Sequence, residues 1–217
     1  CQISDFRFQM SDFRCQTIIP RRGINDDGLG KKHALHKLIT AATAPYVWLQ
    51  DDDVLPAPGQ NATLTLPPAD LYILPLKMEG GPSLLEQLQV AEYAAIQEVT
   101  MRTARRGRAV MCSGANMIVH RDRWLESWAD LHQDIPSGDD MFLLESFRKR
   151  GLRIVAIDRP DITATVSAQI TWRGLLHQRM RWAGKAPHYT DKYIRRYGAI
   201  VLVTNLLQLM CPPVILV

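Results

Sequence analysis

The sequence lacks paired cysteines, a strong excess of one charge, internal repeats and low-complexity tracts. Its four cysteines are scattered over 217 residues without a CxxC pair, which argues against a secreted disulfide framework and a cysteine-ligated zinc site. The formal net charge of +4 is too small to indicate nucleic acid, and we expect no nucleic-acid partner. Hydrophobic residues make up 47% and charged residues 22% of the chain, a composition typical of a globular protein.

The two ends lack the features of natural termini. The chain begins at Cys1 rather than Met, without a signal-peptide pattern, and it stops at Val217 within an apolar run. We therefore expect it to be an internal piece of a longer protein.

The apolar run is the clearest departure from a soluble composition. Residues 198–217 are 20 in number and carry no charge, about the length that crosses a bilayer core of ~30 Å. Residues 171–197 carry seven Lys or Arg against a single acid, Asp191, which places this flank on the cytoplasmic side. We predict a transmembrane segment over 198–217. A buried core helix is the alternative, because Thr204 and Asn205 are polar.

Strand and helix patterns alternate along the rest of the chain. The helix expected over 83–106 opens with the capping box Ser83-x-x-Glu86, and the helix expected over 140–150 stops at Gly151. A Pro-rich surface loop is expected over 56–68. Such alternation predicts an α/β layered domain. The expected strands cover residues 46–50, 70–76, 109–112, 116–120 and 153–157.

Three aspartates follow the first of these strands. Side chains two apart on a strand share one side, so Asp51 and Asp53 are expected to converge while Asp52 turns away. Carboxylates at this edge of an α/β sheet suit magnesium or manganese that also holds a substrate's phosphates. The alternative is an acidic turn without a ligand.

A glycine turn precedes two lysines near the start of the chain. Asn25 and Lys32 stand where a Walker loop requires Gly and Ser or Thr, so that motif is absent. Lys31 could still bring a cation to a pyrophosphate, and a solvated basic turn explains the residues equally well.

A second acidic group, Asp139-Asp140, opens the helix over 140–150. Acidic residues favour a helix N-terminus through capping and the helix dipole. The functional interpretation makes Asp140 a general base that accepts a proton from an attacking hydroxyl.

The last motif is Gln178-Arg-Met-Arg-Trp182. On a helix, Gln178, Arg181 and Trp182 share one face, which offers an amide, a guanidinium for phosphate oxygens and an aromatic plane for a sugar ring. A basic amphipathic helix at a membrane surface is the alternative.

In order and spacing these motifs resemble the membrane-associated glycosyltransferases of family 2, which include cellulose, hyaluronan and poly-N-acetylglucosamine synthases and ceramide glucosyltransferase. The resemblance covers about residues 28–217. The matching motifs are Gly30-Lys31 with Ala34-Leu35, Asp51-Asp52-Asp53, Ser113-Gly-Ala-Asn116, Gly138-Asp139-Asp140 and Gln178-Arg-Met-Arg-Trp182.

The resemblance implies a GT-A type fold, a Rossmann-like mixed sheet with flanking helices, and inverting transfer of a sugar from a nucleotide-linked donor, usually UDP-linked. The resemblance implies that Asp140 is the catalytic base and that Asp51 and Asp53 bind a divalent metal ion, magnesium or manganese. The residues implied at the donor are Lys31, Asp51, Gln178, Arg179 and Arg181. Those implied at a glycan or lipid acceptor are Ser113, Gly114, Asn116, Asp139 and Trp182.

The resemblance also implies a division of the chain. Residues 1–169 would form a partial GT-A domain, 170–197 an interfacial helical region against membrane lipid, and 198–217 the truncated membrane segment, with the catalytic domain on the cytoplasmic side. The first strand–helix–strand unit of the family, which holds the nucleoside, is absent from the sequence, so the fold is expected to be incomplete at its N-terminus. The acidic pair reads Asp-Asp where many synthases have Glu-Asp, which leaves the chemistry intact. A nucleotidyltransferase and a non-catalytic membrane-docked α/β module are the other hypotheses.

Overall fold

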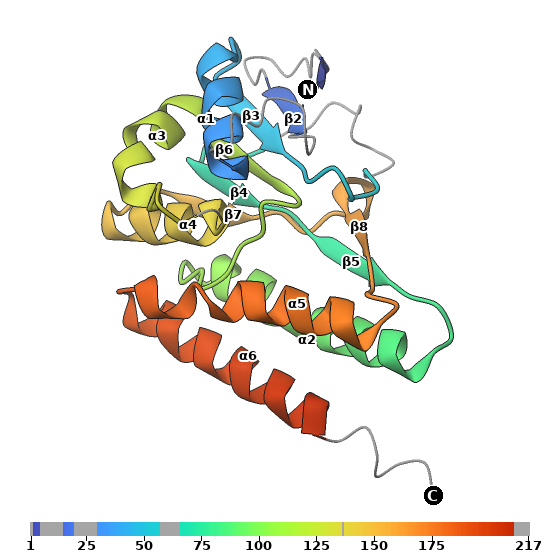
Figure 1. The fold of residues 1–217 in the computed structure, drawn as a ribbon. Helices are drawn as coiled ribbons and strands as arrows, with labels where there is room; N and C mark the ends of the chain where they lie inside the picture. The colour runs from blue at the N-terminus through green and yellow to red at the C-terminus, as the bar shows by residue number, and fades with distance from the viewer. Residues whose placement is uncertain (1, 5–14, 20–29, 57–65, 136, 211–217) are drawn as a thin grey trace, which may run out of the picture.

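The computed structural model describes residues 2–4, 15–19, 30–56, 66–135 and 137–210. Within them a mixed six-stranded sheet runs in the order β1-β2-β3-β6-β4-β7 (Figure 1). β2 pairs with β3 and β4 with β7 in parallel, while β6 runs antiparallel to both β3 and β4. The strands are β1 (Gln2–Ser4), β2 (Cys15–Ile19), β3 (Tyr46–Leu49), β4 (Leu71–Ile73), β6 (Met117–His120) and β7 (Ile154–Ala156).

A second, two-stranded sheet and six α-helices complete the described part of the chain. β5 (Leu76–Glu79) pairs in parallel with β8 (Ala164–Ser167). In Figure 1 α1, α3 and α4 lie beside the large sheet, while α2, α5 and α6 form a separate group below it. The helices are α1 (Lys31–Ala41), α2 (Leu84–Arg105), α3 (Arg121–Glu126), α4 (Asp139–Lys149), α5 (Trp172–Ala183) and α6 (Lys192–Met210).

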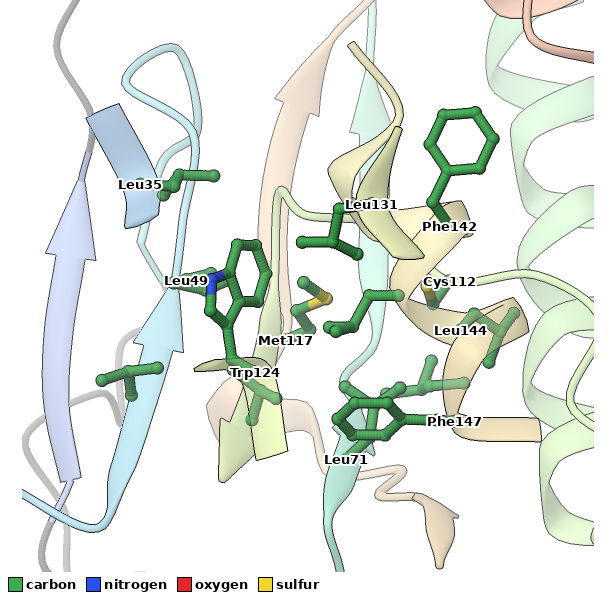
Figure 2. Close-up of a cluster of buried hydrophobic side chains, with 14 of the residues drawn as sticks. Leu35, Leu49, Leu71, Cys112, Met117, Trp124, Leu131, Phe142, Leu144 and Phe147 are labelled. Atoms are coloured by element: carbon green, nitrogen blue, oxygen red, sulfur yellow. The ribbon is translucent and has the colours of Figure 1, made fainter. Parts of the chain in front are cut away.

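Both faces of the large sheet are covered. Because side chains alternate along a strand, Val47 and Leu49 enter the larger core while Trp48 enters the other. Figure 2 shows the larger core, in which Leu35 from α1 and Phe147 from α4 meet the strand residues. Burial on two faces fixes the register of the strands, and with it the position of the residues that follow β3.

The predicted α/β class and most elements are confirmed. Ser83 accepts a hydrogen bond from the Glu86 N–H and caps α2, and Gly151 ends the α4 segment with a left-handed φ of 64°. Two strand predictions are wrong. The segment 70–76 divides into β4 and β5 at Pro75, which has no N–H for a ladder. Residues 109–112 form no strand, and the Ala109 carbonyl accepts a hydrogen bond from Arg148 of α4 in place of a strand partner.

The predicted membrane segment is not confirmed. No helix in the described part of the chain combines the length and the apolar character needed to cross a membrane. Residues 198–210 form the later part of α6, which begins at Lys192 and continues through Gly198 without a break. Residues 211–217 lie outside the described residues.

Candidate active site

The start of α4 brings two carboxylates to the centre of the site. Gly138 precedes the helix in the left-handed conformation, with φ 87°, and a Cβ there would lie 2.7 Å from Lys185 Cδ. The left-handed φ therefore favours glycine here, and a side chain would also push Lys185 aside. This conformation allows the chain to turn sharply into α4 with Asp139 and Asp140 as the first residues of the helix.

Asp140 is held as an anion. Its carboxylate accepts hydrogen bonds from the N–H of Gly114 at 3.2 Å and of Met141 at 2.8 Å. Burial acts to raise the pKa of Asp140, but the charges of Lys185 and Lys31 and these two N–H groups outweigh it and lower the pKa below its ordinary value. An ionised carboxylate is the form that a general base requires.

Asp139 lies in a different environment although it is the next residue. It is 3% exposed, and its Oδ2 has no hydrogen-bond partner among the described residues. Burial raises the pKa of Asp139, the Lys31 charge lowers it, and the charges of Asp140 and Asp51 raise it further, so the net direction is upward. The two neighbouring carboxylates are thus driven in opposite directions by their surroundings.

Lys31 connects the end of β3 with the start of α4. Its Nζ lies 2.5 Å from Asp51 Oδ1 and 3.8 Å from Asp139 Oδ2. Burial would lower the pKa of Lys31, but the charges of Asp139 and Asp51 raise it above its ordinary value. Gly114 lies against the same group, since a Cβ there would be 3.2 Å from Asp139 Oδ2 and 3.6 Å from Lys31 Nζ. The structure therefore gathers three predicted site residues, from three separate parts of the chain, around the Lys31 ammonium group.

The adjacent Lys32 has a structural role. Its buried ammonium donates to the backbone carbonyls of Leu131, His132 and Ile135. This fixes the loop that leads into Gly138 and α4.

The aspartate motif lies in a turn rather than in an extension of β3. The chain turns at Asp52 and Asp53, and both are exposed. The strand alternation used to predict that Asp51 and Asp53 converge therefore does not extend to Asp53. No group of three His, Cys, Asp or Glu able to hold a metal ion occurs among the described residues. Magnesium and manganese need only one or two carboxylates when substrate phosphates supply further oxygens, so a metal at Asp51 stays a prediction.

A cavity of about 220 Å³ lies beside this charged group. Asp140 and Ser113 line it together with Arg179 and Trp182 from α5. The acidic motif at the start of α4 and the basic motif of α5 therefore meet at one cavity. The other members of the basic motif, Gln178 and Arg181, are not among its described lining residues, and Arg181 is exposed.

Arg179 is the buried member of the basic motif. It is 8% exposed, and its Nη2 donates to Glu92 Oε2 of α2 at 2.5 Å. The guanidinium also stacks on Trp182, 4.4 Å from the ring centroid. Burial lowers the pKa of Arg179, and the Glu92 charge acts against this. Its Nε and Nη1 have no partner among the described residues, and both atoms are buried.

Asn116 lies away from the site, in the interior. Its Oδ1 accepts from Trp48 Nε1 at 2.8 Å, and its Nδ2 donates to the carbonyls of Pro75 and Ile162. These bonds tie both sheets together, so the position of Asn116 favours a structural role over the predicted contact with an acceptor.

Sequence reasoning missed three residues of the site. Lys185 lines the cavity and acts on Asp140 through its charge. Tyr93 of α2 also lines it, and burial together with the charges of Asp51 and Asp140 raises its pKa. Glu92 pairs with Arg179. Lys185 could have been noticed three residues beyond the basic motif, whereas Glu92 and Tyr93 lie in the middle of a long helix and carry no motif.

Comparison with known proteins agrees with this geometry. A family model described as "Glycosyltransferase like family 2" matches residues 12–185. Comparison with curated proteins gives no match.

Solved structures of related fold are also found. A mannosyltransferase from Pyrobaculum calidifontis, in complex with GDP-Man and Mn²⁺, is similar with a TM-score of 0.52 at 18% identity, over 88% of this chain and 54% of that one. Glucosyl-3-phosphoglycerate synthase from Mycobacterium tuberculosis, in complex with phosphoglyceric acid, gives 0.38 at 20% identity, over 77% and 54%. The chain spans about half the length of these two proteins. The likeness to the mannosyltransferase shows the fold alone, an α/β mixed sheet of the GT-A type, as predicted.

Proposed function

Because the chain belongs to the glycosyltransferase-like family 2, we propose that it forms the catalytic part of an enzyme that transfers a sugar from a nucleotide-sugar donor to an acceptor hydroxyl with inversion at the anomeric carbon. The observation that carries the proposal is the single hollow in which Asp140 meets Arg179 and Trp182, next to the ion pair of Lys31 with Asp51. A nucleotidyltransferase has no use for the basic helix at that place.

The donor side of the proposed site is the group around Lys31. A diphosphate leaves the sugar easily only when its growing charge is compensated. Lys31 supplies an ammonium there, and Asp51 with Asp53 would hold a magnesium or manganese ion, which neutralises the phosphates when it is bound. A bound Mn²⁺ in the mannosyltransferase of similar fold supports this assignment. UDP is the expected nucleotide, on the family resemblance alone.

The acceptor side is the cavity. Asp140, kept ionised by Lys185, Lys31 and two backbone N–H groups, would take the proton of the acceptor hydroxyl as its oxygen attacks the sugar carbon. The bond to the leaving diphosphate breaks on the opposite side of that carbon, so the configuration inverts. Trp182 would stack on the acceptor. Arg179, which the family resemblance assigns to the donor, lines the same cavity as Trp182 and would donate to the acceptor instead.

A membrane location belongs to the same proposal, with the catalytic part on the cytoplasmic side. Support comes from α5, where the apolar residues Trp172, Leu176 and Met180 are exposed at helical spacing beside Arg173 and Arg181. Apolar and basic side chains together suit the surface of an anionic membrane.

The experiment is Asp140→Asn in the full-length protein in membranes, offered a panel of labelled nucleotide sugars. Loss of the base is expected to lower transfer by at least about 10²-fold. UDP with Mn²⁺ should raise the melting temperature of the variant and of the unchanged protein alike. The exposed Asp122→Asn is the matched control and should keep full activity. Near-normal transfer by the Asp140 variant would remove this residue from the mechanism.

A second variant tests the metal assignment separately. Replacing both Asp51 and Asp53 by Asn should abolish the thermal response to UDP with Mn²⁺. A retained response would contradict their role.

A further inference from the structure

The wall of the cavity has a polar part and an apolar part. Asp140, Ser113 and Lys185 bring charge and hydrogen-bonding groups to it. The wall contributed by α6 is different, since of its five lining residues one alone, Asn205, has a polar side chain, and the others are Ile194, Gly198, Val201 and Leu202.

The aliphatic wall is long and reaches the surface. Ile194 and Asn205 are eleven positions apart, which is about 16 Å along a helix at about 1.5 Å per residue. Leu202 lines the cavity and is also 40% exposed. The apolar lining therefore continues onto the outer surface of α6, which gives a flexible chain a route out of the cavity.

The volume sets a limit on what can be enclosed. About 220 Å³ is less than the roughly 300–1,000 Å³ of pockets that enclose a whole drug-sized molecule. The cavity can hold the reacting end of an acceptor and a first stretch of what is attached to it. The remainder must leave along α6.

A polar group at the cavity is ready to bind the reacting end. Arg179 is more than nine-tenths buried, and two of its donor atoms have no partner among the described residues. Leaving such donors unsatisfied is costly. Both atoms are closed off from solvent, so a hydroxyl-bearing head group would satisfy them once the side chains that cover them move. Because Arg179 is already neutralised by Glu92, the pair suits a head group that carries little charge.

We infer that the acceptor is a lipid, with a hydroxyl-bearing head at Asp140 and Arg179 and a hydrocarbon chain that runs between α2 and α6 past Gly198 and Val201. The inference rests on the proposed function and narrows its acceptor. A growing glycan is bound through rows of hydrogen bonds and aromatic platforms, and the α6 wall offers neither. A hydrocarbon chain needs only the apolar surface that this wall presents, and each methylene buried there should tighten binding about fourfold.

Gly198 allows a clean test, because a Cβ at this position would meet no atom within 4 Å. Gly198 lines the cavity, so a larger side chain would extend into it, and removing a glycine from a helix interior should not weaken α6. Gly198→Leu and Gly198→Trp fill the cavity progressively, and Gly198→Ala barely changes it. Val203→Trp is the matched control, since Val203 is exposed on the same helix and is not among the described lining residues.

The probe is 11-(dansylamino)undecan-1-ol, an uncharged hydroxyl-bearing chain whose fluorescence rises when it enters an apolar site. Gly198→Trp is expected to weaken its binding at least tenfold, Gly198→Leu to an intermediate degree, and Gly198→Ala and Val203→Trp less than twofold. Decan-1-ol should displace the probe, and cellotetraose should not. Unchanged binding by Gly198→Trp, or displacement by the oligosaccharide alone, would overturn the inference.

A product measurement separates this inference from the proposed function. In membranes with a labelled nucleotide sugar, the label should pass into chloroform–methanol, and Gly198→Trp should reduce it while the thermal response to UDP with Mn²⁺ persists. Label found only in an insoluble polysaccharide, undiminished in Gly198→Trp, would refute the lipid acceptor and leave the glycosyltransferase intact. Absence of any donor-dependent product would count against the proposed function, and the probe experiment would still decide whether the cavity binds a chain.

Discussion

At the scale of single residues, Gly114 controls the spacing of the charged group. A Cβ at this position would lie 3.2 Å from Asp139 Oδ2, close enough that the carboxylate must move by a few tenths of an ångström. The Gly114 N–H also holds Asp140. We expect Gly114→Ala to lower the rate of transfer about tenfold or more, because small misplacements of catalytic groups are costly. Steady-state transfer with labelled donor, together with the melting temperature, measures both effects.

The control is Gly107→Ala, which should lower the stability and leave the rate of transfer unchanged. Gly107 has a φ of 66°, and a Cβ there would meet nothing within 4 Å. Alanine in this conformation costs about 1–2 kcal/mol of stability, and the site is untouched. If the two variants lose activity equally, the spacing argument for Gly114 fails.

Through Asp139, Lys31 affects how the stability of the fold changes with pH. Burial raises the pKa of Asp139, and Lys31 opposes the rise. A carboxylate whose pKa is higher in the folded than in the unfolded state stabilises the fold fully below about pH 4, and this stabilisation is lost as the pH rises through the folded pKa. Lys31→Gln moves that pKa higher still. The variant should therefore lose more stability than the unchanged protein between pH 5 and pH 8, by about 1.4 kcal/mol for each additional pKa unit.

Urea unfolding at the two pH values measures this difference. The double variant Lys31→Gln/Asp139→Asn removes the buried acid and should lose the extra pH dependence. An equal pH dependence in Lys31→Gln and the unchanged protein would show that Lys31 does not control Asp139.

A site residue could be predicted from the sequence only where the local sequence fixes its position. Asp51 follows a buried strand and Asp140 opens a capped helix, so both could be placed near the sheet edge from the sequence. Arg179 and Arg181 lie on one short helix, and the way α5 packs on α2 decides which of them is buried. That packing involves Glu92, 87 positions away in the sequence, and no local pattern reports it.

At the scale of elements, α4 fixes the start of α6. Glu145 is buried on α4, and its Oε1 accepts hydrogen bonds from the N–H and hydroxyl of Thr190 and from the N–H of Asp191. Burial acts to raise the pKa of Glu145, but these bonds outweigh it and lower the pKa. Asp191 in turn caps α6 by accepting from the Tyr193 N–H at 2.7 Å. The wall of the cavity is thereby tied to the helix that carries Asp140.

Glu145→Gln should weaken this attachment. Hydrogen bonds to a charged group contribute about 1.5–3 kcal/mol, and an amide replaces them poorly. We expect a loss of stability of that size at pH 7 and faster hydrogen exchange over 190–205. Because the pKa is lowered in the fold, the contribution of Glu145 is lost as the pH falls below about 4, and there the variant and the unchanged protein should converge. Glu98→Gln on the surface of α2 is the control and should change neither quantity. Equal exchange of α6 in the Glu145 variant would contradict the proposed attachment.

The elements themselves were predictable where sequence patterns were complete. The capping box at Ser83 and the stop at Gly151 gave α2 and α4 nearly to the residue. Prediction failed where long-range pairing decides the structure. Residues 109–112 are apolar, as in a buried strand. They bond instead to α4, which begins about thirty positions later in the sequence.

At the scale of the whole molecule, α5 and α6 line the cavity on one side and present basic residues to solvent on the other. The exposed residues of this pair include five cations and no carboxylate within the described residues. The single acid of the region, Asp191, pairs with Arg148. Exposed apolar side chains on α5, such as Met180 at 63%, lie among these charges. The cations are Arg173, Arg181, Lys192, Arg195 and Arg196.

This surface should bind vesicles that contain anionic lipid. Each basic residue near such a membrane contributes about 1 kcal/mol, so Arg173→Gln/Arg181→Gln should weaken binding to phosphatidylserine-containing vesicles by about 30-fold at low salt. Vesicle sedimentation of the two proteins measures the change, and vesicles of phosphatidylcholine alone should bind neither well. Arg102→Gln/Arg106→Gln removes the same charge from exposed positions at the C-terminal end of α2 and just after it, and this variant should bind like the unchanged protein. Equal weakening by both double variants would mean that net charge, rather than the α5–α6 surface, directs the molecule to the membrane. A lipid acceptor entering along α6 would then lack a defined approach to the cavity.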